Sequence, residues 1–262
     1  MYKELVKYQL PEFLQNFFHM KYLVIYSYAF LIAFGCLVSV QFTRKMAKKE
    51  LGIIDLSYTF FYLIFIAGFV GGKLFFYFEN PLKYFNNPNL LLDNFSGGFV
   101  FYGSFITIIP VVIWYLKKNK IQVLPMLDIL AFTTLIVHAF GRFGCYNAGC
   151  CYGKSTNSWF GIIFPTSNNT PVHPTQLYEV VILLTIIIIL SIVKKYKQFH
   201  GQLFLLYISI YGLSRAILEN FRGDQRGFII QNLVSHSQFI ALLLLITTIL
   251  FYYKLNSKKI NP

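Results

Sequence analysis

The chain has 262 residues, of which 56% are apolar and only 13% are charged. Because soluble domains carry roughly 25% charged residues, this composition excludes an ordinary soluble protein and favours a membrane protein with several spans. The net charge of +13 would suit a nucleic-acid partner, but the Lys and Arg residues stand in short clusters between apolar runs. That arrangement is typical of membrane topology signals, so we expect a membrane environment and no nucleic-acid partner.

The first segment, residues 1–21, is amphipathic. Between residues 2 and 18, apolar residues recur at helical spacing, although Pro11 interrupts the run. They are Val6, Leu10, Phe13 and Phe17. The pattern predicts an interfacial helix that lies on the membrane surface, and a frayed N-terminus is the alternative.

Seven apolar stretches follow, and each is long enough to cross a membrane as a helix. They are residues 22–41, 53–78, 97–116, 124–143, 175–193, 203–221 and 233–253. We therefore predict an all-α integral membrane protein with about seven transmembrane helices. Residues 22–253 form this transmembrane domain, and residues 254–262 form a basic tail.

Clusters of Lys and Arg follow the first, third, fifth and seventh stretches, while the other connections carry fewer basic residues. Because basic residues stay on the cytoplasmic side, this pattern predicts an outer N-terminus and a cytoplasmic C-terminus. Lys3, Lys7 and Lys21 near the N-terminus stand against that orientation. The orientation places the Cys-rich stretch and the histidine motif described below at the outer face.

The sixth stretch carries Tyr211, Arg215 and Glu219 four residues apart, on one face of a helix. Charges inside a membrane are tolerated when they pair or line a wet cavity. Arg215 could bind an anionic ligand, because a guanidinium donates two parallel hydrogen bonds to a phosphate. The alternative is an Arg215–Glu219 ion pair that only stabilises helix packing.

Arg142, near the end of the fourth stretch, has His138 one turn before it and Gly141 and Gly144 beside it. Small residues let a helix end open and expose backbone N–H groups, which favours an anion. The alternative is that Arg142 extends to the lipid headgroups without forming a specific site. Two arginines on separate spans at one membrane face favour an anionic lipid headgroup as the ligand.

The segment from His173 to Glu179 opens the fifth stretch, and its Pro174 suits a first helical turn. Gln176 and Glu179 add polar groups at the head of an apolar helix. Taken alone, the segment is equally well explained by helix capping with an interfacial histidine.

Cys145, Cys150 and Cys151 lie between these two motifs. Metal binding is the least favoured interpretation, since C-x4-C-C is not a common zinc spacing and no nearby histidine pair completes a tetrahedral set. A disulfide at an oxidising outer face is a second interpretation. We favour the third, packing of small, soft side chains in a tight loop, and predict no metal site.

Four motifs together resemble the prolipoprotein diacylglyceryl transferase family, and the resemblance covers most of the chain. They are Gly97-Gly98 to Gly103; Gly141-Arg142-Phe143-Gly144 with Gly149 and Gly153; Pro171 with His173-Pro174-Thr175-Gln176-Leu177-Tyr178-Glu179; and Tyr211-Gly212-x-x-Arg215-x-x-x-Glu219-x-Phe221-Arg222. Their order on a seven-span frame makes the resemblance specific.

The resemblance implies an enzyme of the bacterial plasma (inner) membrane that crosses it several times. The family transfers a diacylglyceryl group from phosphatidylglycerol to the lipobox cysteine thiol of a preprolipoprotein, so that a thioether forms and glycerol phosphate leaves. The expected partners are therefore phosphatidylglycerol or another anionic phospholipid and the signal peptide of a preprolipoprotein. The resemblance implies no metal and no organic cofactor.

The resemblance also implies roles for individual residues. Arg142 and Arg215 would bind the phosphate and stabilise its charge. Tyr102 takes the position of a family histidine; because a neutral phenol is a poor base, His138 or Glu219 could generate the thiolate instead. The expected substrate-binding residues are Gly98, Gly103, Gly141, Gly144, Gly153, His173, Gln176, Tyr178, Glu179, Tyr211 and Arg222.

The chain departs from the family pattern at Tyr102, and also at Cys145 and Cys150, where the family usually has asparagine and glutamate. It therefore looks like a divergent branch, and a related lipid transferase with another donor or acceptor is the main alternative. A membrane thiol–disulfide protein that uses the three cysteines is a second alternative. A transporter is a third, which the lack of apparent internal repeats disfavours.

Overall fold

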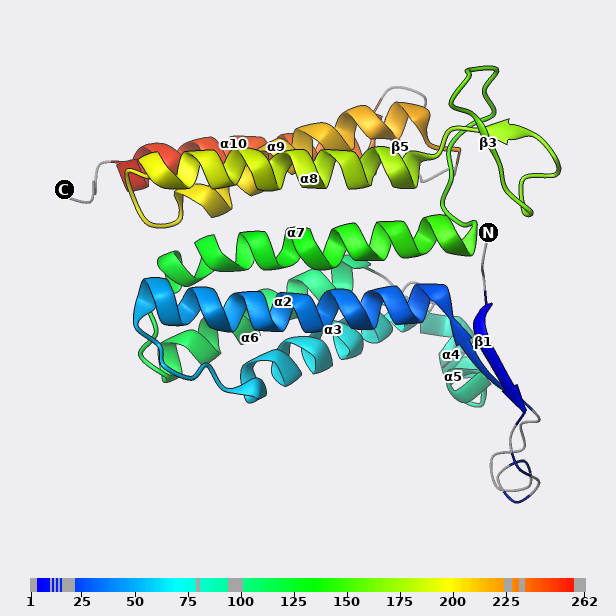
Figure 1. Ribbon diagram of the computed structural model, residues 1–262, viewed down its shortest axis with the longest axis horizontal. Helices are drawn as coiled ribbons and strands as arrows, with labels where there is room; N and C mark the ends of the chain where they lie inside the picture. The colour runs from blue at the N-terminus through cyan, green and yellow to red at the C-terminus, as the bar shows by residue number, and fades with distance from the viewer. Residues whose placement is uncertain are drawn as a thin grey trace. The chain divides into compact units, whose positions relative to one another are not determined.

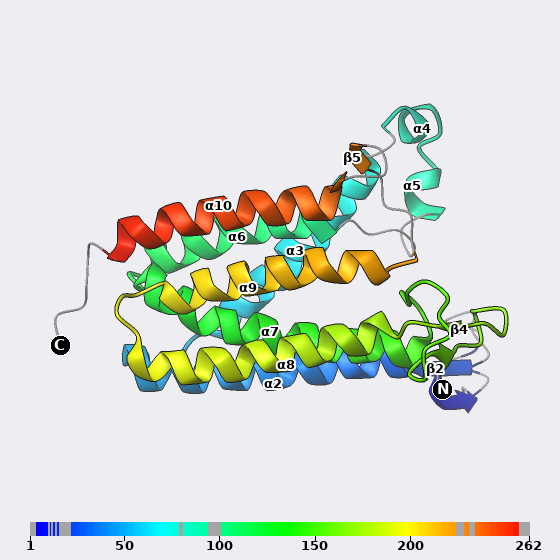
Figure 2. The same ribbon diagram turned by 90° about the horizontal axis from the view of Figure 1, so that it is seen from above.

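A computed structural model describes residues 4–9, 11, 13, 15, 22–78, 81–93, 101–223, 228–230 and 234–256. The chain is mostly helical (Figures 1 and 2). Its longer helices are α2 (Ser27–Leu51), α3 (Tyr58–Phe78), α6 (Phe101–Lys118), α7 (Val123–Ala148), α8 (Thr175–Val193), α9 (Gln202–Leu218) and α10 (His236–Asn256). Shorter elements are α4 (Pro81–Asn86), α5 (Leu90–Asp93) and the 3-10 helices η1 (Lys194–Tyr196) and η2 (Glu219–Phe221). Each predicted apolar stretch overlaps one of the longer helices.

Four helical segments are long and apolar enough to cross a membrane: Ser27–Leu51, Tyr58–Phe78, Val123–Ala148 and Thr175–Tyr196. The outward face of α8 shows why water is an unsuitable solvent for them. Its Val181, Leu184, Ile188 and Ile192 recur at helical spacing and are each at least half exposed. Such a continuous apolar face suits lipid, so the prediction of an all-α membrane protein is confirmed at this level.

The described part of the N-terminal segment follows the predicted helix only in places: residues 4–9 form a strand, whereas Phe13 and Gln15 are helical. Strand β1 (Glu4–Gln9) pairs antiparallel with β2 (Tyr22–Tyr26), which immediately precedes α2. The sequence of β2, Tyr-Leu-Val-Ile-Tyr, is made of aromatic and branched residues that favour strands. The predicted helix is therefore replaced by a strand at residues 4–9, and the predicted first span began five residues before α2.

Two further pairs of short strands complete the described sheets. Strands β3 (Ile162–Ile163) and β4 (Pro171–Val172) pair within the loop between α7 and α8. Strands β5 (Phe228–Ile230) and β6 (Val234–Ser235) pair before α10. The contacts divide the chain into two compact units, residues 44–126 and residues 1–43 with 127–262.

In the smaller unit, α3 and α6 approach closely at glycines. A Cβ placed on Gly103 would lie 2.4 Å from the carbonyl oxygen of Gly71. Side chains of α6 also reach the backbone of α3: Ser104 Oγ donates to Gly68 O at 2.7 Å, and Thr107 Oγ1 donates to Ala67 O at 2.7 Å. Small residues of this kind let membrane helices pack backbone to backbone. Gly103, predicted to bind substrate, therefore has a packing role.

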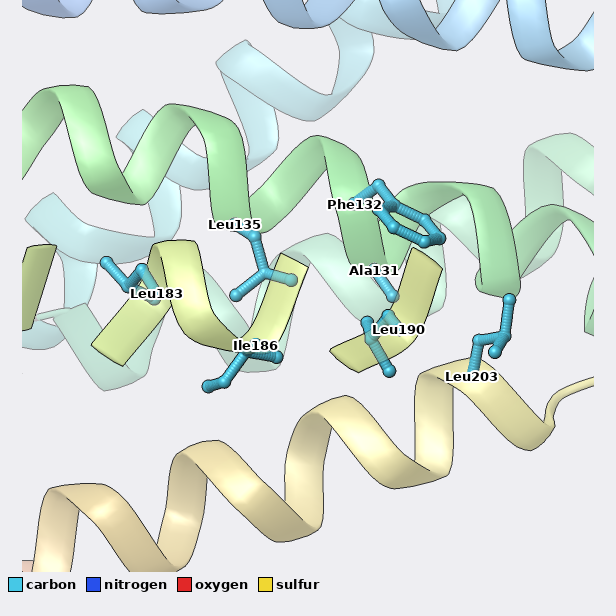
Figure 3. Packing of buried hydrophobic residues seen from close by; sticks show 7 residues of the cluster. All are labelled: Ala131, Phe132, Leu135, Leu183, Ile186, Leu190 and Leu203. Carbon is cyan, nitrogen blue, oxygen red and sulfur yellow. The ribbon is translucent and has the colours of Figure 1, made fainter. Parts of the chain in front are cut away.

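In the larger unit, a buried apolar cluster joins α7, α8 and α9 (Figure 3). Its members are Ala131, Phe132, Leu135, Leu183, Ile186, Leu190 and Leu203. Helix α10 packs on α9, where Ser209 Oγ donates to Thr248 Oγ1 at 2.8 Å. This packing holds α7, α8 and α9 side by side and so positions the polar residues farther along them.

Asp128 fixes the turn between α8 and α9 from its place on α7. Its carboxylate is 1% exposed and accepts from the backbone N–H of Gly201 at 2.9 Å and of Phe204 at 3.1 Å. Lys197 Nζ lies 3.2 Å from the same carboxylate. A buried carboxylate is thus matched by one charge and two backbone donors.

We expect Asp128→Ala to lower the free energy of unfolding by about 3 kcal/mol, because it leaves a largely buried ammonium and two N–H groups without an acceptor. The matched control is Asp55→Ala, whose carboxylate is 71% exposed and pairs with Arg44. That variant should lose less than about 1 kcal/mol. Unfolding in detergent micelles measures both, and equal losses would contradict the role given to Asp128.

Candidate active site

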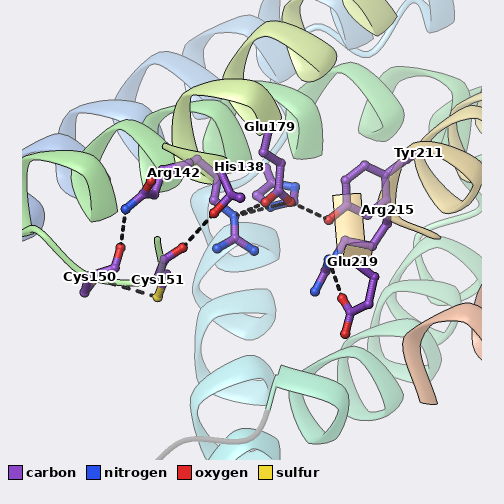
Figure 4. Close-up of polar contacts among 10 residues, drawn as sticks. His138, Arg142, Cys150, Cys151, Glu179, Tyr211, Arg215 and Glu219 are labelled. Carbon is purple, nitrogen blue, oxygen red and sulfur yellow. Dashed lines mark hydrogen bonds and ion pairs between the residues drawn. The ribbon is translucent and has the colours of Figure 1, made fainter. Parts of the chain in front are cut away.

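The centre of the site is the carboxylate of Glu179, which is 2% exposed. Arg142 Nε lies 2.9 Å from its Oε2, and His138 Nε2 lies 3.3 Å from its Oε1. Tyr211 Oη donates to Oε1 at 2.8 Å (Figure 4). The carboxylate of α8 is therefore engaged by two residues of α7 and one of α9, which offsets the cost of burying its charge.

Helical spacing explains why these side chains converge. His138 and Arg142 are four residues apart on α7, and Glu179 begins the second turn of α8. The ring of Tyr211 meets that of His138 edge to face, with centroids 5.2 Å apart. The polar contacts of Arg142 within the described chain, to Glu179 and to His138, both use Nε. Its Nη1 and Nη2 atoms thus remain for a ligand.

Arg215 and Glu219 follow Tyr211 on the same face of α9 and its 3-10 extension. Arg215 Nη1 lies 2.7 Å from Glu219 Oε2, and the two side chains are 12% and 10% exposed. The ion pair that the sequence left as an alternative therefore exists. Yet Nη1 and Nη2 of Arg215 are buried and make no aligned hydrogen bond within the described chain. Since buried donors are nearly always satisfied, these N–H groups suit an oxygen-rich ligand.

The loop after α7 meets the end of η2 at Gly153. The Gly153 N–H donates to His173 O at 2.8 Å, and the Lys154 N–H donates to Phe221 O at 2.9 Å. A Cβ on Gly153 would lie 2.2 Å from that Phe221 oxygen, so no side chain fits. Arg222 pairs with Gly153 across an isolated bridge and is 4% exposed. The second and fourth motifs are thereby joined through backbone.

His173 and Tyr178 lie in an aromatic cluster beside the site. His173 Nδ1 is 3.1 Å from Tyr178 Oη, and both rings contact Phe221. Phe160 contacts the same two rings. No contact joins His173 to Glu179 among the described residues, so His173 and Tyr178 belong to this aromatic cluster and not to the Glu179 network.

The cysteine loop follows a standard helix ending. Gly149 has φ +68°, its N–H donates to Tyr146 O at 3.1 Å, and the Cys150 N–H donates to Cys145 O at 3.2 Å. These two bonds define a Schellman motif with the glycine at position C′. In this motif the residue at C3, in the last helical turn, meets the residue at C″, directly after the glycine. Cys145 and Cys150 occupy those two positions. Cys151 then has φ +64°, which turns its side chain toward the other two.

The three thiols gather as a result. All four cysteines are free, and the Sγ atoms of Cys145, Cys150 and Cys151 lie within 4.8 Å of one another. The pKa of Cys151 lies below its ordinary value, because the other two thiols hydrogen-bond to it and Arg142 and Arg222 add positive charge. The described cluster is the one group of cysteines that could hold a metal ion.

The first turn of α8 fastens this loop. Gln176 Nε2 donates to Cys150 O at 2.6 Å, and Thr175 Oγ1 donates to Cys151 O at 3.0 Å. Gln176 is 1% exposed, and its Oε1 accepts no hydrogen bond within the described chain. Sequence reasoning missed the role of Thr175. The glycine at 149, read as a helix C-cap, would have predicted the meeting of Cys145 with Cys150.

The structure therefore unites His138, Arg142, Glu179 and Tyr211, and places Arg215 with Glu219 on the following turns. Among the predicted glycines, Gly144 packs against Tyr28, where a Cβ would meet the ring at 3.0 Å. Gly141 has no atom of its own unit within 4 Å of such a Cβ. Gly98 and the side chain of Tyr102 lie outside the described part.

Comparison with known proteins identifies relatives over most of this length. The family described as "Prolipoprotein diacylglyceryl transferase" matches residues 15–254. A phosphatidylglycerol--prolipoprotein diacylglyceryl transferase of Clostridium tetani is 36% identical over 88% of the chain and 93% of that protein. Phosphatidylglycerol--prolipoprotein diacylglyceryl transferase 2 of Clostridium perfringens is 32% identical over 88% of the chain and 91% of that protein. The enzyme of Rickettsia typhi is 37% identical over 72% of the chain and 75% of that protein.

Two glycines of one motif provide a matched test of the site's architecture. Gly153→Ala should lower the free energy of unfolding by about 2 kcal/mol or more, because a methyl group would overlap the Phe221 carbonyl. Gly141→Ala meets no such obstacle within its unit and should leave stability unchanged or raise it by up to about 1 kcal/mol. Thermal unfolding of the two purified variants measures both effects. A Gly141→Ala variant less stable than Gly153→Ala would refute the packing described.

Proposed function

Because this chain belongs to the prolipoprotein diacylglyceryl transferase family, we propose that it transfers the diacylglyceryl group of phosphatidylglycerol to the lipobox cysteine thiol of preprolipoproteins. A thioether forms and glycerol phosphate leaves. The observation that carries the assignment of residues is the pair of incompletely used guanidinium groups, Arg142 and Arg215, at the Glu179 network.

The two arginines suit the phosphate of an anionic lipid. Glu179 holds Arg142 by its Nε and leaves the Nη edge. Glu219 lies 2.7 Å from Nη1 of Arg215, and the buried Nη2 of Arg215 has no acceptor in the described chain. A phosphate oxygen accepts bidentate hydrogen bonds from such forks. These donors are already oriented by Glu179 and Glu219, so they stabilise the charge that develops on the leaving phosphate without reorganising.

The reaction is a substitution at the glycerol carbon next to the phosphate. The thiolate sulfur attacks that carbon, the carbon–oxygen bond breaks, and its electron pair stays on the phosphate oxygen. The thiol proton must first be removed. Glu179 and Glu219 are both engaged by arginines, which leaves His138 as the better-suited of the proposed bases. We also keep Tyr102 as a proposed catalytic residue, because it takes the position of a family histidine in the sequence.

Substrate binding extends from this centre. Gln176, with a buried and unused Oε1, offers an acceptor to a hydroxyl of the lipid headgroup or an N–H of the peptide. His173 and Tyr178 form the aromatic wall, and Arg222 adds positive charge. The lipid tails enter sideways between helices. Gly98, Gly103, Gly141, Gly144, Gly153 and Tyr211 complete the proposed set through backbone approach and the hydroxyl contact to Glu179.

For the membrane arrangement we propose seven spans in the bacterial inner membrane, with the N-terminus outside and the C-terminus in the cytoplasm. The positions of the seven longer helices and the basic residues that follow alternate ones support this. Residues 1–21 would lie at the outer interface, and residues 254–262 would form a basic cytoplasmic tail. The site then faces the side on which preprolipoproteins present their lipobox cysteine.

Arg142→Ala should lower transfer by at least about 100-fold, because the phosphate loses a preoriented donor. Arg142→Lys should recover little, since a lysine lacks the planar fork. Arg44→Ala, which removes a partly buried arginine paired with the exposed Asp55, is the matched control and should keep the wild-type rate. Mass spectrometry of a lipobox peptide incubated with enzyme and phosphatidylglycerol measures all three. Full activity of Arg142→Ala would exclude the phosphate role.

The orientation has its own test. A green fluorescent protein fused after Asn256 should fluoresce, because it stays in the cytoplasm, and a fusion after Lys118 should do the same. Alkaline phosphatase fused after Lys154 should be active, because that enzyme folds outside. Fluorescence of a fusion after Lys154 would overturn the proposed topology.

A further inference from the structure

The cluster of Cys145, Cys150 and Cys151 has no task in the reaction as described so far. Its three Sγ atoms lie within 4.8 Å of one another, and those of Cys150 and Cys151 are 3.7 Å apart. Sulfur ligands on a tetrahedral zinc ion, at bond lengths of about 2.3 Å, stand about 3.8 Å apart. Small rotations of the side chains would therefore let all three thiolates bind one ion.

The backbone conformation brings these thiols together, so their proximity does not depend on the rotamers of the side chains alone. The Schellman motif at Gly149 brings together Cys145 and Cys150, and the positive φ of Cys151 turns the third thiol to the same side. A left-handed conformation is strained for a residue with a side chain and persists when the surroundings fix it. Here Gln176 and Thr175 hold the carbonyls of Cys150 and Cys151.

The composition of the cluster indicates the ion and its coordination. Thiolates select soft or borderline cations such as Zn²⁺ over Mg²⁺ or Ca²⁺. Structural zinc sites use four protein ligands, whereas catalytic ones use three and keep one position open. Within the described chain the group comprises three cysteines and no further ligand. Because Cys150 and Cys151 are exposed, an incoming molecule can reach the fourth position.

We propose that Cys145, Cys150 and Cys151 bind one Zn²⁺ ion whose open fourth position takes the thiol of the acceptor peptide. The inference rests on the proposed function, because the acceptor of that reaction is a thiol. It replaces our expectation from the sequence spacing that the chain has no metal site.

The chemistry of this step follows from the ligand. A thiol that binds zinc is deprotonated, so its proton passes to water and the bound sulfur becomes the nucleophile. The sulfur then attacks the glycerol carbon, and the electron pair of the broken carbon–oxygen bond stays with the phosphate. The neutral thioether is a poorer zinc ligand than a thiolate and can leave. No oxidant or reductant is required.

The location of the cluster fits this role. Cys145 follows Arg142 by three residues on α7, a spacing that puts two Cβ atoms about 5–6 Å apart on one face. A bound thiolate would thus stand next to the proposed phosphate site. Zinc with four thiolates carries a net charge of about −2, and Arg142 and Arg222 lie near enough to act on the thiols.

Metal binding is tested without reference to activity. Purified protein should contain about one zinc ion per chain, and Co²⁺ exchanged for it should give the absorption bands of tetrahedral sulfur coordination. Cys150→Ser and Cys151→Ser should lose the ion and these bands. Cys36→Ser changes the fourth cysteine, which lies in α2 outside the cluster, and should keep both. The proposal is overturned if the wild-type protein binds neither ion. It is also overturned if two of the three cysteines form a disulfide.

Thiol coordination is tested on the Co²⁺ protein with the acceptor. A lipobox peptide with cysteine should shift the visible bands, and the same peptide with serine at that position should not. Removing the metal with a chelator should lower transfer by about 100-fold, and Zn²⁺ should restore it. The proposal is overturned if the cysteine peptide does not shift the visible Co²⁺ bands. It is also overturned if the metal-free enzyme transfers diacylglyceryl at the full rate.

These outcomes are separable from failure of the proposed function. If metal-free enzyme and Cys151→Ser still transfer diacylglyceryl at the wild-type rate while Arg142→Ala does not, the transferase assignment holds and the zinc role fails. If no sample transfers diacylglyceryl, the proposed function fails. In that case the response of the Co²⁺ bands to the cysteine peptide still decides whether the site binds a thiol.

Discussion

The buried carboxylate of Glu179 is the constraint on which the larger unit depends. An isolated charge in an apolar interior is very costly, and here Arg142, His138 and Tyr211 together compensate it. Those partners come from α7 and α9, so the relative rotation and height of three helices are fixed by one side chain. The apolar cluster farther along these helices adds to their packing but would tolerate sliding, because its contacts are not directional.

The same arrangement pairs two arginines of the site with carboxylates before a ligand arrives. Arg142 lies against Glu179, and Arg215 lies against Glu219. The glutamates also decide how the arginines can bind, because each holds its arginine at one edge and leaves other N–H groups for an oxygen ligand. Orientation is therefore provided before binding, and this is the condition under which electrostatic stabilisation of a leaving group is effective.

The helices and most polar residues of the site could be predicted from the sequence, because hydropathy and four-residue spacing depend on local chain geometry. Helix α8 spans the predicted residues 175–193, and α9 with its 3-10 extension η2 spans residues 202–221, where the prediction was 203–221. The strand pair at the N-terminus could not be predicted this way, since β1 is stabilised by a partner more than ten residues away. The family resemblance implied a substrate contact for Gly103, and in the structure this glycine lies against the backbone of Gly71. A glycine required for close approach looks the same in sequence whether the approaching group is a substrate or a helix.

The cysteines show a different limit of sequence reasoning. Zinc patterns are usually recognised by ligand spacings that hairpins and helices bring together, and C-x4-C-C fits none of them. A Schellman motif, however, brings together the two cysteines of a C-x4-C spacing, which lie on either side of its glycine. The left-handed Cys151 that follows turns its own side chain inward. The loop thus gathers three thiols by backbone geometry alone. The two carboxylates of the site are held by arginines, and His138, the proposed base, contacts Glu179. A thiolate formed on a metal ion at the sulfur cluster would not need His138 to take its proton, so the cluster would act beside this network and not through it.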